Sequence, residues 1–421
     1  MNKELQKQVS CMDDFDPGSL PADVALKKII DAITPVKVKE TVKVRDALGR
    51  VLANDIYSKI NVPSGTNSAM DGYAISSHSI PKSGNFELKI AGTSFAGRPF
   101  EGKLSAGECV RIMTGAIMPQ GTDTVVIQEH VEQNRDMATF DSNIKAGSNV
   151  RKAGEDIATG DLVLAKGIRL APADIGLIAS LGIGQVEVTK KLRVAFFSTG
   201  DELCSIGDEP EDGKIYDSNR YTLHGMLTRL GVEIIDMGVI RDVPEDLETA
   251  FTQAADTADI LITTGGVSVG EADYVKEILE KVGTVNFWKV AMKPGRPLAF
   301  GRIKDTLFFG LPGNPVSVMV TFYQFVQPAM RYLMGEHNIE PLTVKALCKS
   351  KLKKRPGRVE YQRGILEQDE SGQLIVKKTG MQGSGILRSM SQANCFIILP
   401  MENGEVSPDT MVDVQPFHGL V

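Results

Sequence analysis

The chain has 421 residues, 42% hydrophobic and 24% charged, with a formal net charge of −6. This length predicts several domains, and the acidic balance disfavours nucleic acid or a membrane surface as a partner. Five widely spaced cysteines favour a reducing compartment over a disulfide framework or a zinc site. No apolar stretch reaches the roughly 20 residues of a membrane span, and the polar N-terminal segment does not resemble a secretory signal. We therefore expect a soluble, cytoplasmic protein.

The first part of the chain changes pattern twice. Residues 1–18 are typical of a loose tail, and the apolar spacing over 21–33 predicts a helix. From about 36 to 185, short alternating runs are separated by Gly, Pro, Asn and Ser, which predicts a β-rich region. A short apolar helix is expected over 172–181.

From about residue 191 to 335, apolar strands alternate with amphipathic helices. The expected strands cover 193–198, 232–240, 260–264, 285–290 and 307–311. The expected helices cover 219–230, a segment from Pro244, 274–282 and 315–330. This alternation predicts a parallel sheet covered on both faces. Residues 341–421 return to short β runs, which indicate a small barrel or sandwich.

In open parallel sheets, ligands bind beyond the carboxyl ends of the strands. We therefore expect the segments that follow the strands to share one rim. They are residues 198–202, 241–242, 263–273, 292–296 and 311–317. Together they supply glycines, hydroxyls, carboxylates and two cations.

The loop after the third strand is rich in glycine. Gly265 and Gly266 let the backbone approach an anion closely, Thr264 and Ser268 can donate hydroxyl hydrogen bonds, and the helix expected from residue 274 adds a positive dipole end. A tight strand-to-helix turn with polar caps is the structural alternative. The residues alone leave both interpretations open.

The loop over 311–317 is a second strand-to-helix junction. Pro312 and Pro315 stiffen it, whereas Gly313 and Asn314 can adopt left-handed turns. Taken alone, a rigid connector is the better interpretation. Because the loop is expected on the same rim as the glycine-rich loop, a role in ligand binding gains support.

Charged side chains also gather on the expected rim. The acids are Asp201, Glu202, Asp242, Glu271 and Asp273. They would repel one another unless a cation lies between them, and oxygen ligands suit Mg²⁺. Lys293 and Arg296 can clamp an oxyanion. A solvated surface is the alternative for both groups.

Six segments in register resemble a known family. They are residues 68–74, 111–115, 198–203, 265–273, 292–297 and 311–317. The chain resembles the molybdopterin molybdenumtransferases, which include the bacterial MoeA proteins and the E domain of gephyrin. The order and spacing agree from about residue 20 to the C-terminus. Without the resemblance, segments 68–74 and 111–115 would be interpreted as ordinary turns.

The resemblance implies an elongated, four-domain homodimer with the active site at the subunit interface. The α/β domain would face the inserted β-rich domain of the partner subunit. The implied divisions are a tail (1–18), the α/β domain (19–38 and 185–340), a linking domain (39–57 and 160–184), the inserted domain (58–159) and a C-terminal β domain (341–421). A molybdopterin adenylyltransferase and downstream molybdoenzyme factors are the implied protein partners.

The implied reaction joins molybdate to adenylylated molybdopterin with Mg²⁺. The dithiolene sulfurs displace oxo groups on molybdenum, the adenylate is cleaved, and molybdenum cofactor and AMP leave. Carried over by residue, the catalytic set is Asp71, Thr114, Glu202, Asp242 and Asp273. Glu202, Asp242 and Asp273 are the Mg²⁺ candidates. The substrate and anion contacts are Gly265, Gly266, Ser268, Lys293, Arg296, Pro312, Gly313, Asn314, Pro315 and Ser317. Arg296 departs from the family, which often has lysine there.

Three other functions compete with metal insertion. A molybdopterin adenylyltransferase would share the α/β domain but would lack the β-rich insertion and the final β domain. A gephyrin-like binding scaffold is the second alternative. An oxidoreductase would need a dinucleotide fingerprint, which residues 198–203 do not supply. The sequence does not distinguish molybdate from tungstate or identify the acceptor enzyme.

Overall fold

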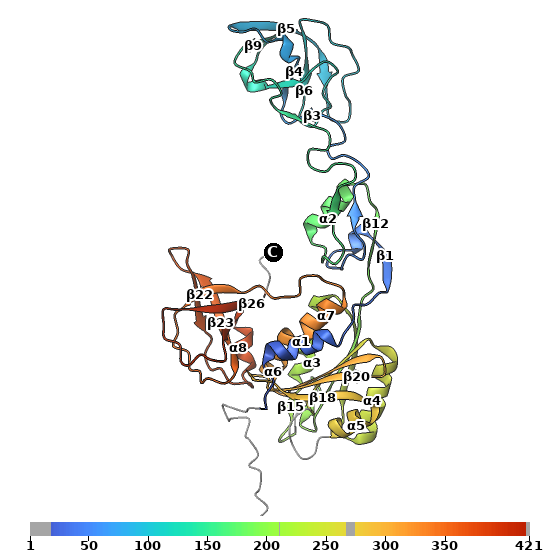
Figure 1. Cartoon of the computed structure of the whole chain (residues 1–421), viewed down its shortest axis with the longest axis vertical. Helices are drawn as coiled ribbons and strands as arrows, with labels where there is room; N and C mark the ends of the chain where they lie inside the picture. The colour runs from blue at the N-terminus through green and yellow to red at the C-terminus, as the bar shows by residue number, and fades with distance from the viewer. Residues whose placement is uncertain (1–17, 210, 267–273, 418–421) are drawn as a thin grey trace, which may run out of the picture. The chain divides into compact units, whose positions relative to one another are not determined.

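The computed structural model describes residues 18–209, 211–266 and 274–417, drawn in colour in Figure 1. The chain divides into two compact units. The first comprises Met1–Glu40, Gly49–Val51 and Val188–Val421, and the second comprises Thr41–Leu48 and Leu52–Glu187. Within the described residues, no helix is long and apolar enough to cross a membrane.

The first unit is built around a six-stranded sheet in the order β16-β13-β17-β21-β20-β18. The strands are β13 (Arg193–Thr199), β16 (Glu233–Ile240), β17 (Ile260–Thr264), β18 (Gly283–Lys289), β20 (Pro297–Ile303) and β21 (Thr306–Leu311). β20 runs antiparallel to both of its neighbours, and the other strands share one direction. The expectation of a mostly parallel sheet is confirmed.

Strand β20 was not predicted from the sequence. It reverses into β21 at Lys304 and Asp305, without the Gly or Asn that usually marks a hairpin. Lys304 itself takes the left-handed conformation, with φ 53°. The hairpin between β20 and β21 therefore forms without the residues by which such turns are recognised in a sequence.

Both faces of this sheet are covered, because successive side chains of a strand point in opposite directions. Phe196 packs into a core that it shares with α1, α3, α6 and α7, whereas Phe197 packs into a core that it shares with α4 and α5. These helices are α1 (Ala22–Asp31), α3 (Ser218–Leu230), α4 (Pro244–Thr257), α5 (Tyr274–Val282), α6 (Pro315–Thr321) and α7 (Gln327–Leu333).

The single helix expected over 315–330 is wrong in detail. A π-helical turn, Phe322–Val326, separates α6 from α7, and helical structure continues to Leu333. Pro328 lies in the first turn of α7. Because proline has no N–H and its ring crowds the preceding turn, the regular α-helical ladder cannot continue through this position.

The C-terminal part of the first unit is a closed five-stranded barrel, as expected. Its strands are β22 (Val344–Cys348), β23 (Val359–Gln368), β24 (Leu374–Lys378), β25 (Cys395–Leu399) and β26 (Thr410–Pro416). Pairing of β23 with both β24 and β25 closes the ring. The short strand β19 (Met292–Lys293) adds to β23, and the short helix α8 (Leu387–Ser391) precedes β25.

The second unit is β-rich, as expected. Its main sheet has the order β7-β4-β6-β5-β9-β8, around a core that contains Tyr73 and Phe140. The strands are β4 (Gly72–Ile75), β5 (Asn85–Ser94), β6 (Glu108–Ile112), β7 (Thr124–Ile127), β8 (Glu132–Asn134) and β9 (Met137–Asp141). Two-stranded pairs join β1 (Lys39–Lys43) with β12 (Gln185–Thr189), β2 (Ile56–Tyr57) with β11 (Leu162–Leu164), and β3 (Asn67–Ser68) with β10 (Val150–Arg151). The helix α2 spans Pro172–Ser180.

Candidate functional site

The parallel strands of the first unit end level with one another. Thr199 of β13 pairs with Ile240 of β16, and Thr264 of β17 pairs with both Ser198 and Leu311. The loops that follow these strands therefore leave the sheet at one edge, called the rim below. This is the arrangement that the order of strands predicted.

The centre of the rim is closely packed around Gly265. Its N–H donates to the Leu311 carbonyl at 3.2 Å, and its φ is 89°. A Cβ at this position would lie 2.2 Å from the Thr199 carbonyl oxygen, so no larger residue fits without movement. Gly313 lies beside Gly265, and its carbonyl accepts from Asn219 Nδ2 at 2.7 Å. Two of the expected loops therefore meet here.

The glycine loop fits its expected role only in part. Gly266 has a left-handed φ of 63° and is half-buried. Thr264, whose hydroxyl can donate to a ligand, is buried and shares a hydrogen bond of 2.9 Å with Ser198, which favours the structural alternative for this residue. The predicted site residues Ser268 and Asp273 lie outside the described residues.

Several buried polar atoms next to the rim have no hydrogen-bond partner among the residues that the structure describes. They are Thr199 Oγ1, Asp217 Oδ2, Asn219 Oδ1 and Thr263 Oγ1. Asp217 caps α3, because its other oxygen accepts from Arg220 N–H at 3.1 Å. Buried polar groups are rarely left unsatisfied, so this side of the rim is suited to water or a polar ligand.

The acidic end of the rim lies beyond β13 and β16. Burial raises the pKa of Asp242 above its usual range, and the charges of Asp201 and Glu202 raise it further. The charges of Asp201 and Glu202 therefore act on Asp242, while their role in a common site stays a prediction. Within the described parts of the chain, no group of three potential ligands is placed to hold a metal ion by itself. A cation here would need oxygens from a substrate as well.

The cationic end lies beyond β18, at the other side of the sheet. Lys293 Nζ lies 3.3 Å from Glu360 Oε1, and Arg296 Nη2 lies 3.5 Å from Ser19 Oγ. Strands β16 and β18 are five positions apart in the sheet, which corresponds to about 24 Å. Asp242 and Lys293 therefore follow strands at opposite edges of the sheet.

The loop over 311–317 begins at the last residue of β21 and leads into α6. Pro312 is buried, whereas Gly313 and Asn314 are exposed at its tip. Pro315 begins α6, as its position at a helix start predicted, and Ser317 is buried within the first turns. The exposed tip between two prolines gives the rim a rigid polar edge.

Residues that the barrel brings to this rim were not predicted from the sequence. Val316 N–H donates to the Ser384 carbonyl at 3.0 Å, which places the 383–385 loop against the start of α6. The neighbouring Arg363 is fully buried; its Nε donates to Ser389 Oγ and its Nη2 to the Gly383 carbonyl, each at 3.0 Å. No motif signals these contacts, because they depend on the packing of β23 beside the α/β sheet.

In the second unit, Asp71 and Thr114 form a pair, as their selection together implied. The Thr114 N–H and hydroxyl donate to Asp71 Oδ1 at 2.7 and 2.9 Å. These two bonds hold the pKa of Asp71 below its usual range. The contact arises because Asp71 precedes β4, Thr114 follows β6, and Gly72 pairs with Ile112. Both side chains are exposed, so the carboxylate is available to a ligand or partner.

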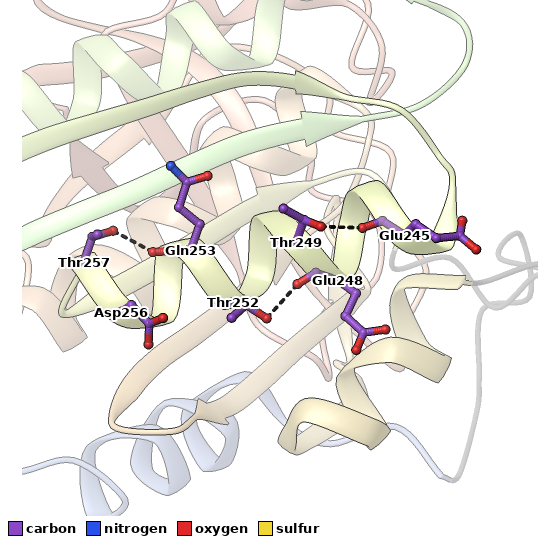
Figure 2. A pocket seen from close by; sticks show the side chains of 7 residues that line it. All are labelled: Glu245, Glu248, Thr249, Thr252, Gln253, Asp256 and Thr257. Carbon is purple, nitrogen blue, oxygen red and sulfur yellow. Dashed lines mark hydrogen bonds between the residues drawn. The ribbon is translucent and has the colours of Figure 1, made fainter.

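A shallow hollow on the outer face of α4 is a poor alternative site. Figure 2 shows that its side chains come from one helix, with Thr249, Thr252 and Thr257 bonded back to carbonyls of α4. Lys281 pairs with Glu248 beside it. The polar groups are already satisfied locally, and the lining contains no cation for an anionic ligand.

The fold defines a multidomain protein in which a doubly wound α/β domain with a polar rim is joined to a β-rich unit and a small barrel. Residues 20–182 match the MoeA N-terminal region (domain I and II), 195–332 a probable molybdopterin binding domain, and 345–417 the MoeA C-terminal region (domain IV).

Known proteins resemble the chain over nearly its whole length. It is 45% identical over 404 residues to the molybdopterin molybdenumtransferase of Haemophilus influenzae, covering 96% of this chain and 100% of the relative. It is 37% identical over 446 residues to gephyrin of Dictyostelium discoideum, covering 93% and 61%. A crystal structure of the MoeA protein from Pyrococcus horikoshii superposes with a TM-score of 0.84 at 29% identity, covering 95% and 100%. The chain belongs to the molybdopterin molybdenumtransferase family, whose named members are transferases.

Proposed function

We propose that this protein inserts molybdate into adenylylated molybdopterin and releases molybdenum cofactor and AMP. The observation that carries the proposal is the rim itself. It joins acids at one end, a glycine-lined centre at Gly265 and Gly313, and a lysine at the other end. Such an extended polar edge suits a long substrate with several anionic groups better than it suits molybdate alone.

The glycine-lined centre supports binding of the phosphate or oxyanion part of the substrates. Backbone N–H groups and the start of α6 supply partial positive charge there. The exposed Asn314 and the buried hydroxyl-bearing Ser317 supply polar contacts at the same junction. Molybdate is a tetrahedral dianion, so cations such as Lys293 and Arg296 suit it.

The acidic end supports the Mg²⁺ part of the proposal. Asp242 and Glu202 offer only oxygen donors, which Mg²⁺ prefers, together with phosphate oxygens of the substrate. Burial raises the pKa of Asp242 most, and the like charges of Asp201 and Glu202 raise it further; a cation would relieve that repulsion. When bound, Mg²⁺ would neutralise charge on the adenylate phosphates during their cleavage. Asp242 and Glu202 would orient that end of the substrate.

We also propose a homodimer in which Asp71 serves the site of the partner subunit. Asp71 and Asp242 belong to separate compact units, and Asp71 is an exposed, ionised carboxylate. We also propose that the protein functions in a reducing compartment such as the cytoplasm, because the four cysteines within the described residues are unbridged. A molybdopterin adenylyltransferase is the proposed source of the substrate.

The direct test supplies the purified chain with adenylylated molybdopterin, molybdate and Mg²⁺. We expect AMP release together with activation of a cofactor-free molybdoenzyme, and loss of both in Asp242→Asn. If the chain instead consumes ATP and unmodified molybdopterin to make the adenylate, it is an adenylyltransferase and the proposal is wrong. If it binds molybdopterin without either reaction, the scaffold alternative gains.

The shared site is tested by mixing two inactive variants. Equal amounts of Asp71→Asn and Asp242→Asn chains, unfolded and refolded together, would form heterodimers with one intact site in two. About a quarter of the wild-type activity should return if the subunits exchange residues across a two-fold interface. No recovery, with heterodimers demonstrated by differently tagged chains, would contradict the shared site.

A further inference from the structure

Lys293 is held by an acid that belongs to the barrel. The strand β19 pairs in parallel with β23, and Lys293 is the register partner of Glu360. Lys293 Nζ lies 3.3 Å from Glu360 Oε1, with 52% of the lysine side chain exposed but only 7% of the glutamate. The cation therefore reaches the surface while its partner is fixed inside the protein.

Glu360 itself has little freedom. Its second oxygen, Oε2, accepts from Gln362 Nε2 at 3.0 Å, and Gln362 also donates to the Lys353 carbonyl at 3.0 Å. A buried carboxylate is costly to leave unpaired, so both of its oxygens are committed. The nearby Lys354 is satisfied by backbone carbonyls, including that of Asn403 at 3.0 Å. The charge of Glu360 also acts on the Lys354 ammonium, but within the described residues the ion pair of Glu360 is the one with Lys293.

The turn after Lys293 is fixed from the other side by the α/β domain. Gly295 has a φ of 93°, and a Cβ there would lie 2.5 Å from Thr321 Oγ1 and 3.5 Å from the Ser317 carbonyl oxygen. The turn therefore packs directly on α6, the helix that begins in the 311–317 loop. The lysine is held between the barrel and the rim.

We propose that Glu360 is a positioning residue, which holds the Lys293 ammonium where a tetrahedral oxyanion meets the rim. A free lysine side chain has many rotamers, and ordering it on binding reduces affinity. The buried carboxylate orders it in advance. Through this pair the C-terminal barrel shapes the anion site of the α/β domain. The inference rests on the proposed function, because it takes Lys293 as an oxyanion contact.

The test is a double-mutant cycle in the full-length protein with Glu360→Gln, Lys293→Ala and the double variant. The readouts are KM for molybdate, kcat at saturating molybdate, and molybdate binding by calorimetry. We expect Glu360→Gln to raise KM and the dissociation constant for molybdate about tenfold, with a smaller change in kcat. In the Lys293→Ala background, Glu360→Gln should have no further effect on KM.

Two further variants guard against a merely structural explanation. Glu360→Asp keeps the charge but withdraws it by one methylene, and should give an intermediate KM. Glu336→Gln is the matched control, because it removes another buried acid, whose Oε2 accepts from Arg331 Nε at 2.8 Å at the end of α7. It should leave KM for molybdate unchanged.

The outcomes separate the inference from the function on which it rests. If Lys293→Ala raises KM but neither Glu360 variant does, the positioning role is wrong and the proposed site stands. If Glu360→Gln weakens molybdate binding equally with and without Lys293, Glu360 acts through general structure and the inference is overturned. If Lys293→Ala itself leaves KM and binding unchanged, the oxyanion role of Lys293 fails first.

Discussion

Substitution of Gly265 by alanine tests whether the centre of the rim governs activity. The new Cβ would lie 2.2 Å from the Thr199 carbonyl oxygen, and the backbone already has a φ of 89°. Relief of this contact requires the loop to move by roughly 1 Å, a displacement that lowers activity about 100-fold when it misplaces a substrate. The movement would also strain the hydrogen bond from Gly265 N–H to Leu311.

The stability effect can be separated from the effect on activity with a matched control. Gly231 at the end of α3 has a φ of 72°, but a Cβ there would meet nothing within 4 Å. Gly231→Ala should therefore lose only the backbone term of about 1–2 kcal/mol. Gly265→Ala should lose about 1–3 kcal/mol more, from overpacking. At about 2–4 °C per kcal/mol, calorimetry can distinguish the two variants.

The activity of both variants would be measured as AMP release and cofactor formation at a temperature where each is folded. We expect kcat/KM to fall about 100-fold in Gly265→Ala and to stay near the wild-type value in Gly231→Ala. Wild-type activity in Gly265→Ala, with a melting temperature no lower than that of Gly231→Ala, would refute the proposed packing of the rim.

Three further predictions concern charged and polar groups. Thr114→Val removes one of two donors to Asp71 and should raise the pKa of this carboxyl. A lowered pKa stabilises the fold above the unfolded value of 3.8, so urea denaturation should show a loss of stability at pH 7. The loss should fade as the pH falls from 3.8 through the lower folded-state pKa. Thr114→Ser should retain the stability. Asp242→Asn should raise the melting temperature at neutral pH, because a raised pKa means that ionisation destabilises the folded state as pH rises above 3.8; an unchanged value would contradict the acidic cluster. Arg363→Met should leave the barrel folded, because apolar packing would replace a buried guanidinium. Burial lowers the pKa of this guanidinium to about 10. Loss of the β signal in circular dichroism would contradict this expectation.

The sequence predicted the α/β architecture well because its signals are local. The run from Val194 to Phe197 is apolar on both faces, which is typical of a strand covered on both sides. Asp217 and Gly231 mark the start and end of α3 by capping chemistry that a short stretch of sequence contains. The order of such elements then determined which loops share the rim.

Other features were beyond prediction because their causes are not local. The Thr264 hydroxyl, a candidate donor to a ligand in the sequence, forms a hydrogen bond with Ser198 of the neighbouring strand instead. The hairpin at Lys304 forms without a turn signal because the neighbouring strand pairs hold it in place.

By itself, the sequence determined where most strands and helices lie along the chain, which glycines and charged residues follow them, and the family to which the chain belongs. Only the tertiary structure decided that acids and cations lie at opposite ends of one rim, and that Glu360, distant in the chain, fixes Lys293. The reason is physical. Periodicity and capping act between residues a few positions apart, whereas strand order and burial are set by packing of the whole unit.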